Sequence, residues 1–440
     1  MQCYSNHTSN IMQNTLLLHN SHWKTGYFNI PIKRKLLDKL LQFHETKQIQ
    51  IITGLRRSGK SSLLKLYINE LIKTENPKSI LFVNFDDPNY SDVYEKPEKI
   101  YNIVETAENL TQTKIKYLFF DEIQTVTGWE KYVKSVYDAE AFKKICITGS
   151  NSKLLLGDYS HLLSGRYIAN QMYPLSLSEI LNHYKYSDKL TVLHNKAKVV
   201  NIIERCLKYG CFPEIVLQKN ELIKHEILTN YYDSILIKDC IINKNIRDNK
   251  SFKELAFYIF NNISALYSYN SLSKSTGIND ISVKEYINAM DEAFMIYEIS
   301  NFSYKIKKQI KSKRKLYTID NGLINATALN FSENKGKLFE NFVFAELLKF
   351  GAEGIFLHND NKECDFIIKI GKKIIAIQVA YEINISNRER EINGLLQAKK
   401  MFNITNLFIV TMSQSEIIND IPVVPVYELD KVFEKQPQKK

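Results

Sequence analysis

The chain of 440 residues is longer than one ordinary hydrophobic core accommodates, so we expect two or three domains. Hydrophobic residues make up 44% and charged residues 24%, as in soluble globular proteins, and no apolar run approaches the length of a membrane span. The formal net charge is +11, and the six cysteines show no CxxC or other paired spacing, so neither a disulfide framework nor a zinc site is supported.

Residues 1–24 are rich in Asn, Ser and His. Their apolar patch, residues 16–18, is too short for the core of a secretory signal. We therefore predict a disordered tail over residues 1–30 in a cytoplasmic protein. Paired leucines at helical spacing in residues 32–47 predict a helix that leads into the first strand.

Residues 54–61, Gly-Leu-Arg-Arg-Ser-Gly-Lys-Ser, have the complete spacing of a phosphate-binding loop. The apolar residues before the loop predict a buried strand, and residues 62–71 have the apolar spacing of a helix. Glycines let consecutive amides face inward, and the helix N-terminus adds its positive field, so a polyphosphate fits there. We expect Lys60 to reach the outer phosphates and Ser61 to hold Mg²⁺. The predicted nucleotide-binding residues are Gly54, Arg57, Ser58, Gly59, Lys60, Ser61 and Ser62.

A hydrophobic strand over residues 116–120 ends in Asp121 and Glu122, about sixty residues after the loop. Strands that alternate with helices predict a parallel sheet with ligands at the carboxyl ends of its strands. There Asp121 would hold Mg²⁺ through water, and Glu122 would polarise the attacking water. The strand over residues 144–149 leads to Ser150 or Asn151, either a sensor of the terminal phosphate or simply a turn.

Residues 175–250 read as mostly helical, and three helical segments follow, with Gly277 in the turn before the last. With strands over residues 295–302 and 315–319, this order is the outline of a helix-turn-helix with a wing. The last helix, residues 283–294, carries one lysine and three acids, which favours a structural or protein-binding winged helix over one that reads DNA.

Seven basic residues and no acidic residue lie between positions 302 and 319. They would either follow a DNA phosphate backbone or form a solvated hairpin whose charges prevent aggregation, and we weigh these alternatives equally. They are Lys305, Lys307, Lys308, Lys311, Lys313, Arg314 and Lys315.

The last part of the chain predicts a small α/β domain. An amphipathic helix over residues 337–350 carries Glu340, and two strands joined at Gly371 follow it. A helix over residues 388–401 and a strand over residues 406–411 complete the domain.

Eight motifs together resemble one family, the bacterial and archaeal AAA+ ATPases that carry a C-terminal domain of unknown function, DUF4143. The resemblance runs from about residue 30 to near the end of the chain. The motifs are GLRRSGKS at 54–61, FFDEIQ at 119–124, TGSNS at 148–152, LSGR at 163–166, YPLSLSE at 173–179, GCFPE at 210–214, YTIDNGL at 317–323 and GKLFEN at 336–341.

The resemblance implies an α/β fold: an AAA-type P-loop sheet with the Asp-Glu strand next to the loop strand, then a helical lid with a winged helix. It also implies a role for Arg166 as a sensor or arginine finger. It implies no known substrate. We place the ATPase domain at residues 31–180, the lid and winged helix at 181–325, and the C-terminal domain at 330–430.

The C-terminal domain also resembles a restriction-endonuclease-like core, whose metal site would use a helix glutamate, an aspartate on the first strand and Glu-x-Lys on the second. Glu340 and Asp365 match this pattern, but the second strand has Gln378 in place of the glutamate and Ala380 in place of the lysine. Without the lysine, the attacking water is not activated and the phosphate charge is not balanced. We therefore favour a degenerate, structural or nucleic-acid-docking version over an active nuclease.

The sequence thus predicts an ATPase with ATP and Mg²⁺ as cofactors that couples its nucleotide state to the winged helix and the C-terminal domain. One alternative is a nucleotide-gated DNA-binding or DNA-processing protein, and another is a nucleotide-dependent protein-interaction switch. The oligomeric state and the choice between ATP and GTP stay open at this stage.

Overall fold

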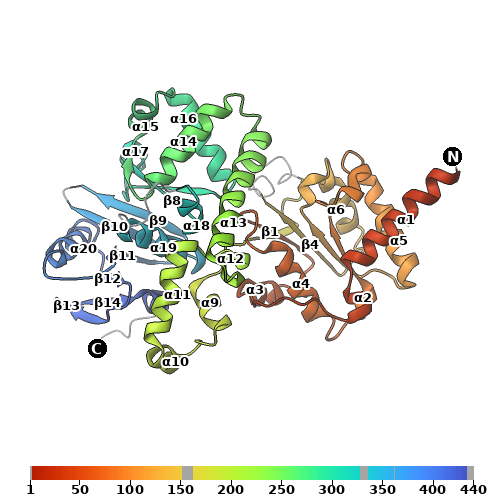
Figure 1. Ribbon diagram of the computed structural model, residues 1–440, viewed down its shortest axis with the longest axis horizontal. Helices are drawn as coiled ribbons and strands as arrows, with labels where there is room; N and C mark the ends of the chain where they lie inside the picture. Colours follow the sequence, from red (N-terminus) through yellow and green to blue (C-terminus); the bar gives the residue numbers. More distant parts are fainter. Residues whose placement is uncertain (1, 151–161, 328–334, 361, 434–440) are drawn as a thin grey trace. The chain divides into compact units, whose positions relative to one another are not determined.

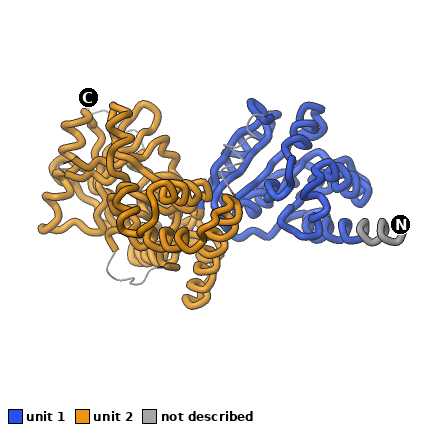
Figure 2. The backbone as a smooth tube through the Cα atoms, turned by 90° about the horizontal axis from the view of Figure 1, so that it is seen from above, with its two compact units in different colours: residues 1–173 blue, residues 174–440 orange. Residues whose placement is uncertain are grey.

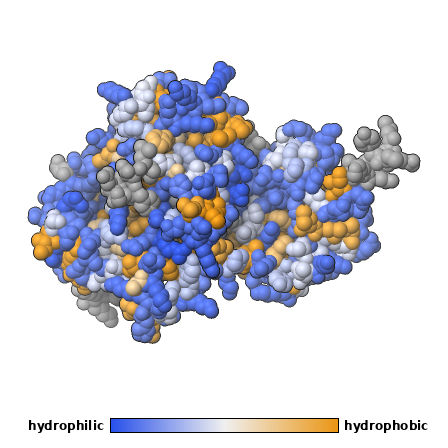
Figure 3. Space-filling model, viewed as in Figure 1, coloured by the Kyte–Doolittle hydropathy of each residue, from blue (hydrophilic) through white to orange (hydrophobic). Residues whose placement is uncertain are grey.

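A computed structural model describes residues 2–150, 162–327, 335–360 and 362–433 of the chain. The chain forms two compact units, residues 1–173 and 174–440 (Figure 2). On the face drawn in Figure 3, hydrophilic side chains predominate and hydrophobic ones form several small, separate patches. Among the helices of the described ranges, none has both the length and the apolar character needed to cross a membrane.

The first unit contains a five-stranded, fully parallel sheet in the order β2-β3-β4-β1-β5. Figure 1 labels its neighbouring strands β1 and β4. The expected position of the Asp-Glu strand beside the loop strand is wrong, because β4 pairs with both and separates them. The strand order depends on pairing between distant segments, which local periodicity does not encode. The strands are β1 (Ile49–Thr53), β2 (Ile80–Asn84), β3 (Tyr117–Asp121), β4 (Lys144–Gly149) and β5 (Tyr167–Gln171).

Both faces of this sheet are buried, because successive side chains of each strand point to opposite faces. Ile51 of β1 packs in one apolar cluster with helices α5 and α6, and its neighbour Ile52 packs in the other with α3 and α4. The helices are α3 (Leu36–Gln42), α4 (Lys60–Leu71), α5 (Ile100–Thr111) and α6 (Trp129–Asp138), with short 3₁₀ turns at Pro77–Ser79, Pro88–Val93, Pro97–Lys99 and Ile123–Thr125.

The prediction of a disordered tail over residues 1–30 is wrong. Helix α1 (Gln2–His19) packs against α5 and the edge strand β2, and α2 (His22–Thr25) follows it. The Asn20 side chain donates to the carbonyl oxygen of Phe82 at 2.9 Å and accepts from the Phe82 amide at 2.8 Å. An edge strand leaves backbone groups unpaired, and the Asn20 amide satisfies them as a neighbouring strand would. The polar composition that suggested disorder therefore includes side chains with a structural role.

The second unit begins with helices, as the sequence predicts. A π-helical segment, Ile235–Ile242, continues directly from α13. The helices are α9 (Leu177–His183), α10 (Lys189–His194), α11 (Lys196–Tyr209), α12 (Pro213–Leu217), α13 (Glu221–Ser234) and α14 (Asn249–Asn261).

A three-stranded antiparallel sheet in the order β6-β8-β7 follows. Along the chain, two helices lie between β6 and β7. The connection between β7 and β8 contains a short helix, α17, within the stretch of basic residues. The elements are β6 (Leu266–Tyr267), α15 (Tyr269–Thr276), α16 (Asp280–Glu292), β7 (Ile296–Ser300), α17 (Ile306–Lys311) and β8 (Arg314–Thr318).

The end of the second unit is a six-stranded mixed sheet in the order β13-β14-β12-β11-β10-β9. Helix α20 packs against β10 and β11 of this sheet, and α19 supplies contacts to β8 and β11. The elements are α18 (Asn321–Asn325), α19 (Lys335–Lys349), β9 (Gly354–Asn359), β10 (Glu363–Ile370), β11 (Lys373–Val379), α20 (Arg388–Phe402), β12 (Asn406–Thr411), β13 (Glu416–Ile418), β14 (Ile421–Pro425), a 3₁₀ turn (Val426–Glu428) and α21 (Asp430–Phe433).

A buried carboxylate, Asp320, ties the helices of the second unit to the segment that follows β8. Its oxygens accept hydrogen bonds from the amides of Cys211 at 2.7 Å and Gly322 at 2.8 Å. Burial raises the pKa of Asp320 to about 6. Gly210 has a φ of 76°, and a Cβ there would lie 1.7 Å from an Asp320 oxygen, so only glycine fits beside this carboxylate.

We predict that Asp320→Ala lowers the free energy of unfolding by about 2–5 kcal/mol, because it leaves two buried amides without acceptors. Chemical denaturation measures this change. The exposed Asp360→Ala is the control and should stay within about 0.5 kcal/mol of the wild type. Equal stability of the two variants would contradict the structural role of Asp320.

Candidate functional site

The loop between β1 and α4 has the backbone that a phosphate cradle requires. Gly54 has a φ of 147°, and a Cβ there would lie 2.0 Å from the carbonyl oxygen of Met172. Gly59 has a φ of 100° and precedes the first residue of α4, while Arg57 is exposed with a φ of 69°. The loop therefore turns tightly into the N-terminus of a twelve-residue helix, where backbone amides and the helix dipole favour an anion.

Lys60, the first residue of α4, is buried and surrounded by oxygen atoms. Its ammonium donates to the carbonyl oxygens of Gly54 at 3.1 Å and Leu55 at 3.3 Å. It also forms an ion pair with Glu122, with 3.4 Å between Nζ and Oε1. The structure thus brings Lys60 together with one of the predicted acidic residues.

Asp121 is the last residue of β3, and Glu122 follows it. Their side chains reach the loop helix α4, although β4 lies between β3 and β1 in the sheet. The Ser61 hydroxyl is hydrogen-bonded to the Asp121 carboxylate. Thr148, near the end of β4, donates its hydroxyl hydrogen to Asp121 and accepts from the Glu122 amide at 3.0 Å. Sequence reasoning missed Thr148, although the strand end Thr-Gly-Ser that suggested Ser150 contains it.

The two carboxylates have opposite pKa shifts. Burial, and then the charge of Glu122, raise the pKa of Asp121. Burial would also raise the pKa of Glu122, but Lys60 and the Gln124 hydrogen bond outweigh it and hold that pKa below its usual value. Glu122 is therefore ionised at neutral pH. Its φ of 52° lies in the left-handed region, a backbone strain that often accompanies functional sites.

Ser150 lies at the same edge of the sheet as Glu122. The Gln124 side chain donates to Glu122 and, at 3.4 Å, to the Ser150 hydroxyl. Asn151, the alternative sensor, lies outside the described residues. Within the described part of the chain, the buried Gln124 Oε1 and Ser58 Oγ have no hydrogen-bond partner, so this site retains polar atoms that a ligand would satisfy.

Arg34 supports the loop from outside the motif, and sequence reasoning missed it. Its buried guanidinium donates to the carbonyl oxygens of Ser58 at 2.8 Å and Tyr173 at 2.7 Å. A lone arginine some twenty residues before the loop gives no signal in a single sequence. Its role depends on the fold, which places the segment before α3 under the loop.

Arg166 does not belong to the phosphate site of its own chain, so its predicted role as a sensor there is wrong. The Ile49 amide donates to the Arg166 carbonyl oxygen at 2.8 Å, at the start of β1, whereas the loop follows the end of β1. Five strand residues, about 15 Å, separate these edges. The Arg166 side chain pairs with Asp138 at 3.0 Å. A finger role, which needs a second copy of the chain, stays a prediction.

The residues at this edge fit a magnesium–polyphosphate. Magnesium prefers oxygen ligands, and Ser61 and Asp121 offer a hydroxyl and a carboxylate that already contact each other. The loop amides and Lys60 suit phosphate oxygens, as does the Ser58 hydroxyl, which has no hydrogen-bond partner among the residues that the structure describes. Ser62 lies one residue further along α4. The arrangement therefore combines an anion cradle, a hard-metal donor pair and an ionised carboxylate.

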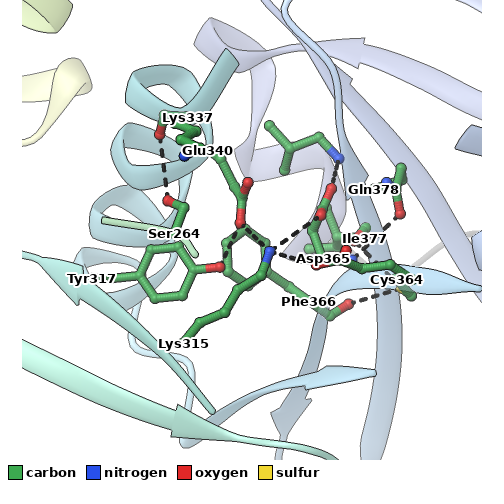
Figure 4. Close-up of polar contacts among 12 residues, drawn as sticks. Ser264, Lys315, Tyr317, Lys337, Glu340, Cys364, Asp365, Phe366, Ile377 and Gln378 are labelled. Carbon is green, nitrogen blue, oxygen red and sulfur yellow. Dashed lines mark hydrogen bonds and ion pairs between the residues drawn. The ribbon is translucent and has the colours of Figure 1, made fainter. Parts of the chain in front are cut away.

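A second cluster forms in the C-terminal part, where the sequence predicts a degenerate nuclease-like site. The structure brings together Glu340 of α19, Asp365 of β10 and Gln378 of β11 (Figure 4). Lys315 of β8, which the sequence suggested as a DNA contact, inserts between the carboxylates. Burial alone would lower the pKa of Lys315, but the surrounding carboxylates raise it above its usual value.

Two of the seven basic residues predicted to form one exposed patch are not available to a partner. Lys315 is buried, and Arg314 pairs with Glu298 and donates to the Tyr269 hydroxyl at 2.8 Å. Both lie on β8, where side chains contact the neighbouring strand and α19. The remaining five are exposed and lie on or beside α17: Lys305, Lys307, Lys308, Lys311 and Lys313.

We predict that Arg34→Met increases amide hydrogen exchange of residues 54–60 about tenfold or more. The substitution removes a charge-assisted hydrogen bond, worth about 1.5–3 kcal/mol, from the loop. Mass spectrometry of the loop peptide measures the exchange. Arg166→Met is the matched control, and loop exchange that rises equally in both variants would refute the assignment of Arg34.

Three family profiles match successive parts of the chain. The profile described as AAA domain matches residues 46–181, and domains of unknown function DUF8612 and DUF4143 match residues 201–335 and 335–429. Similarity to one solved structure, the Walker-type ATPase of Pyrococcus abyssi, has a TM-score of 0.43 at 12% identity. It covers 67% of this chain and 95% of that one.

Two curated relatives extend over most of the chain. An uncharacterized protein of Methanocaldococcus jannaschii is 34% identical over 370 residues, covering 82% of this chain and 80% of the relative. An uncharacterized protein of Haemophilus influenzae is 32% identical over 368 residues, covering 82% and 89%. With these relatives and the AAA and DUF4143 matches, the chain belongs to the family of AAA-domain proteins that carry a C-terminal DUF4143 domain.

Proposed function

We propose that the protein is a magnesium-dependent ATPase. The observation that carries the proposal is the meeting of Lys60, Ser61, Asp121 and Glu122 at one edge of the parallel sheet. ATP is preferred over GTP because the matching profile is an AAA domain. Magnesium would neutralise charge on the phosphates and orient them.

Each residue of this cluster has a separate task. The loop amides and Lys60 bind the phosphates, with Lys60 exchanging the carbonyl oxygens of Gly54 and Leu55 for phosphate oxygens. Ser61 and Asp121 hold the metal. Glu122, which stays ionised, accepts a proton from the attacking water.

Neighbouring side chains orient Glu122 for this task. Gln124 bonds its carboxylate, and Thr148 holds its backbone amide at 3.0 Å. Ser150, whose hydroxyl lies 3.4 Å from Gln124 Nε2, would report on the terminal phosphate through the same network. Gln124 and Thr148, which connect Glu122 to the end of β4, would therefore transmit the nucleotide state to that strand.

We predict that Glu122→Gln lowers kcat for ATP hydrolysis by about 10²–10⁴-fold and leaves nucleotide affinity within about threefold. The amide keeps the shape of the side chain but accepts no proton. A coupled assay of phosphate release measures kcat. Hydrolysis by Glu122→Gln at the wild-type rate would remove Glu122 from the role of general base.

Lys60→Ala should weaken binding of a fluorescent ATP analogue at least about tenfold, because it removes a charge-assisted contact to phosphate worth about 1.5–3 kcal/mol. Lys73→Ala is the matched control, because Lys73 is exposed just beyond the other end of α4. This variant should bind the analogue as the wild type does. Unchanged affinity of Lys60→Ala would place the nucleotide elsewhere.

We also propose that β6, α14 to α16 and the β7–β8 hairpin act as a winged helix coupled to nucleotide state, within a lid and winged-helix region at residues 181–325. The domains on either side would be the ATPase at residues 31–180 and the C-terminal domain at residues 330–430. The order of helices and strands, and the sheet order β6-β8-β7, support this proposal.

DNA binding is the second candidate function, and the charge of α17 favours it. The five exposed lysines on or beside this helix lie around Tyr304, Ile306 and Ile310, whose side chains are also exposed. Exposed lysines favour contact with a phosphate backbone, whereas the acids of α16 disfavour the major groove.

For this candidate we expect duplex affinity to fall with salt, and to fall less steeply when the five lysines are replaced by serine. The slope of log K against log salt should decrease in magnitude by about 0.9 for each phosphate contact removed. Fluorescence anisotropy measures it. Affinity with the same slope in both proteins would exclude α17 as the contact. The matched control replaces five exposed lysines outside the proposed winged helix: Lys189, Lys196, Lys219, Lys372 and Lys373.

A further inference from the structure

Lys315 occupies the centre of the carboxylate cluster in the C-terminal part. Its Nζ lies 2.8 Å from Glu340 Oε1 and 3.9 Å from Asp365 Oδ1 (Figure 4). It also lies 2.6 Å from Glu363 Oε1. The contact to Glu340 is a hydrogen bond of the charge-assisted kind. The contact to Glu363 is an ion pair by distance, and Glu363 Oε1 accepts no hydrogen bond from any residue that the structure describes. The lysine side chain is 5% exposed, so the cluster holds it away from solvent.

Strand β8 is held in place by more than this lysine. Successive side chains of a strand alternate in direction, so Tyr317 lies on the same face as Lys315, and its hydroxyl also donates to Glu340 Oε1. The Asn341 side chain pairs with the backbone of Thr318 through two bonds, at 2.8 and 3.0 Å. One oxygen of Glu340 therefore already accepts two donors.

Two further oxygen atoms that a metal would use are engaged as well. Asp365 Oδ2 accepts from the Val379 amide at 2.8 Å. The Gln378 oxygen accepts from the Asp365 amide at 3.3 Å, and its nitrogen donates to Glu391 at 2.7 Å. Ala380 is buried and its amide pairs with β12. Across the described ranges, no group of three or more His, Cys, Asp or Glu residues is arranged to hold a metal ion.

We propose that Lys315 is the resident cation of this cluster and that the site, unlike a nuclease centre, takes no divalent metal. A metal would need oxygen ligands at about 2.0–2.6 Å in the space that the ammonium fills, and Gln378 supplies no negative charge. The carboxylates instead receive β8 and fasten the three-stranded sheet to the C-terminal sheet. The residues of this cluster are not part of the phosphate site, so the proposal does not rest on the proposed ATPase function.

The position of Lys315 links the cluster to the basic helix. Residue 315 lies four residues after the end of α17, and Arg314, between them, pairs with Glu298 of β7. The ion pairs of Arg314 and Lys315 thus hold the end of the hairpin that presents the five exposed lysines.

The test counts Mn²⁺ bound per chain by electron paramagnetic resonance, without nucleotide, in proteins that all carry Asp121→Asn to silence the phosphate site. We expect Lys315→Met to bind one additional Mn²⁺. Its dissociation constant should be at least tenfold lower than that of any Mn²⁺ bound by the parent. Adding Glu363→Gln to Lys315→Met should remove the gain. Lys313→Met, which removes an exposed lysine two residues away, should match the parent.

A second comparison does not depend on the folding of Lys315→Met. The parent and its Glu363→Gln variant, which changes a partly exposed carboxylate, should bind the same amount of Mn²⁺. Mn²⁺ bound by the parent and lost in Glu363→Gln would overturn the proposal. So would a folded Lys315→Met protein, verified by circular dichroism, that gains no Mn²⁺.

Discussion

The buried ion pair between Lys60 and Glu122 is the interaction on which the candidate active site depends. It joins the first residue of α4, the helix after β1, to the residue that follows β3. The strands β1 and β3 are not neighbours in the sheet. A buried ammonium or carboxylate is costly without a partner, so each of the two stabilises the other. The strand between β1 and β3, β4, contributes Thr148, whose side chain contacts both Asp121 and the Glu122 amide. The site is therefore assembled from three strands by polar side chains.

Local motifs predicted which residues meet at the candidate phosphate site, because these residues lie in two short segments. The loop spacing identified Lys60 and Ser61, and an apolar strand ending in two acids identified Asp121 and Glu122. The strand order, the support from Arg34 and the place of Arg166 could not be predicted, since each depends on pairing between distant segments. The N-terminal helix was missed because Asn20 acts as a substitute strand partner, for which composition gives no signal.

The C-terminal cluster illustrates the same limit in another form. Its three expected members meet in space, and the missing lysine at position 380 was evident from the sequence. The lysine that does enter the cluster comes from β8, and in the sequence it looks like part of an exposed basic stretch. A run of charged residues is expected to lie in solvent, because burial of an unpaired charge is costly. Here the carboxylates of α19 and β10 pair with one member of the run, Lys315, and allow its burial. The two clusters thus each hold one buried lysine among carboxylates, but only the first adjoins an anion cradle.

The most direct measurement is a crystal structure with Mg²⁺ and a non-hydrolysable ATP analogue. The account predicts that the phosphates lie against residues 54–62, that Lys60 leaves the carbonyl oxygens of Gly54 and Leu55 for a phosphate oxygen, and that the metal binds Ser61 beside Asp121. Lys315 should stay between its carboxylates. An analogue bound elsewhere in the chain, with Lys60 still bonded to the loop carbonyls, would contradict the account.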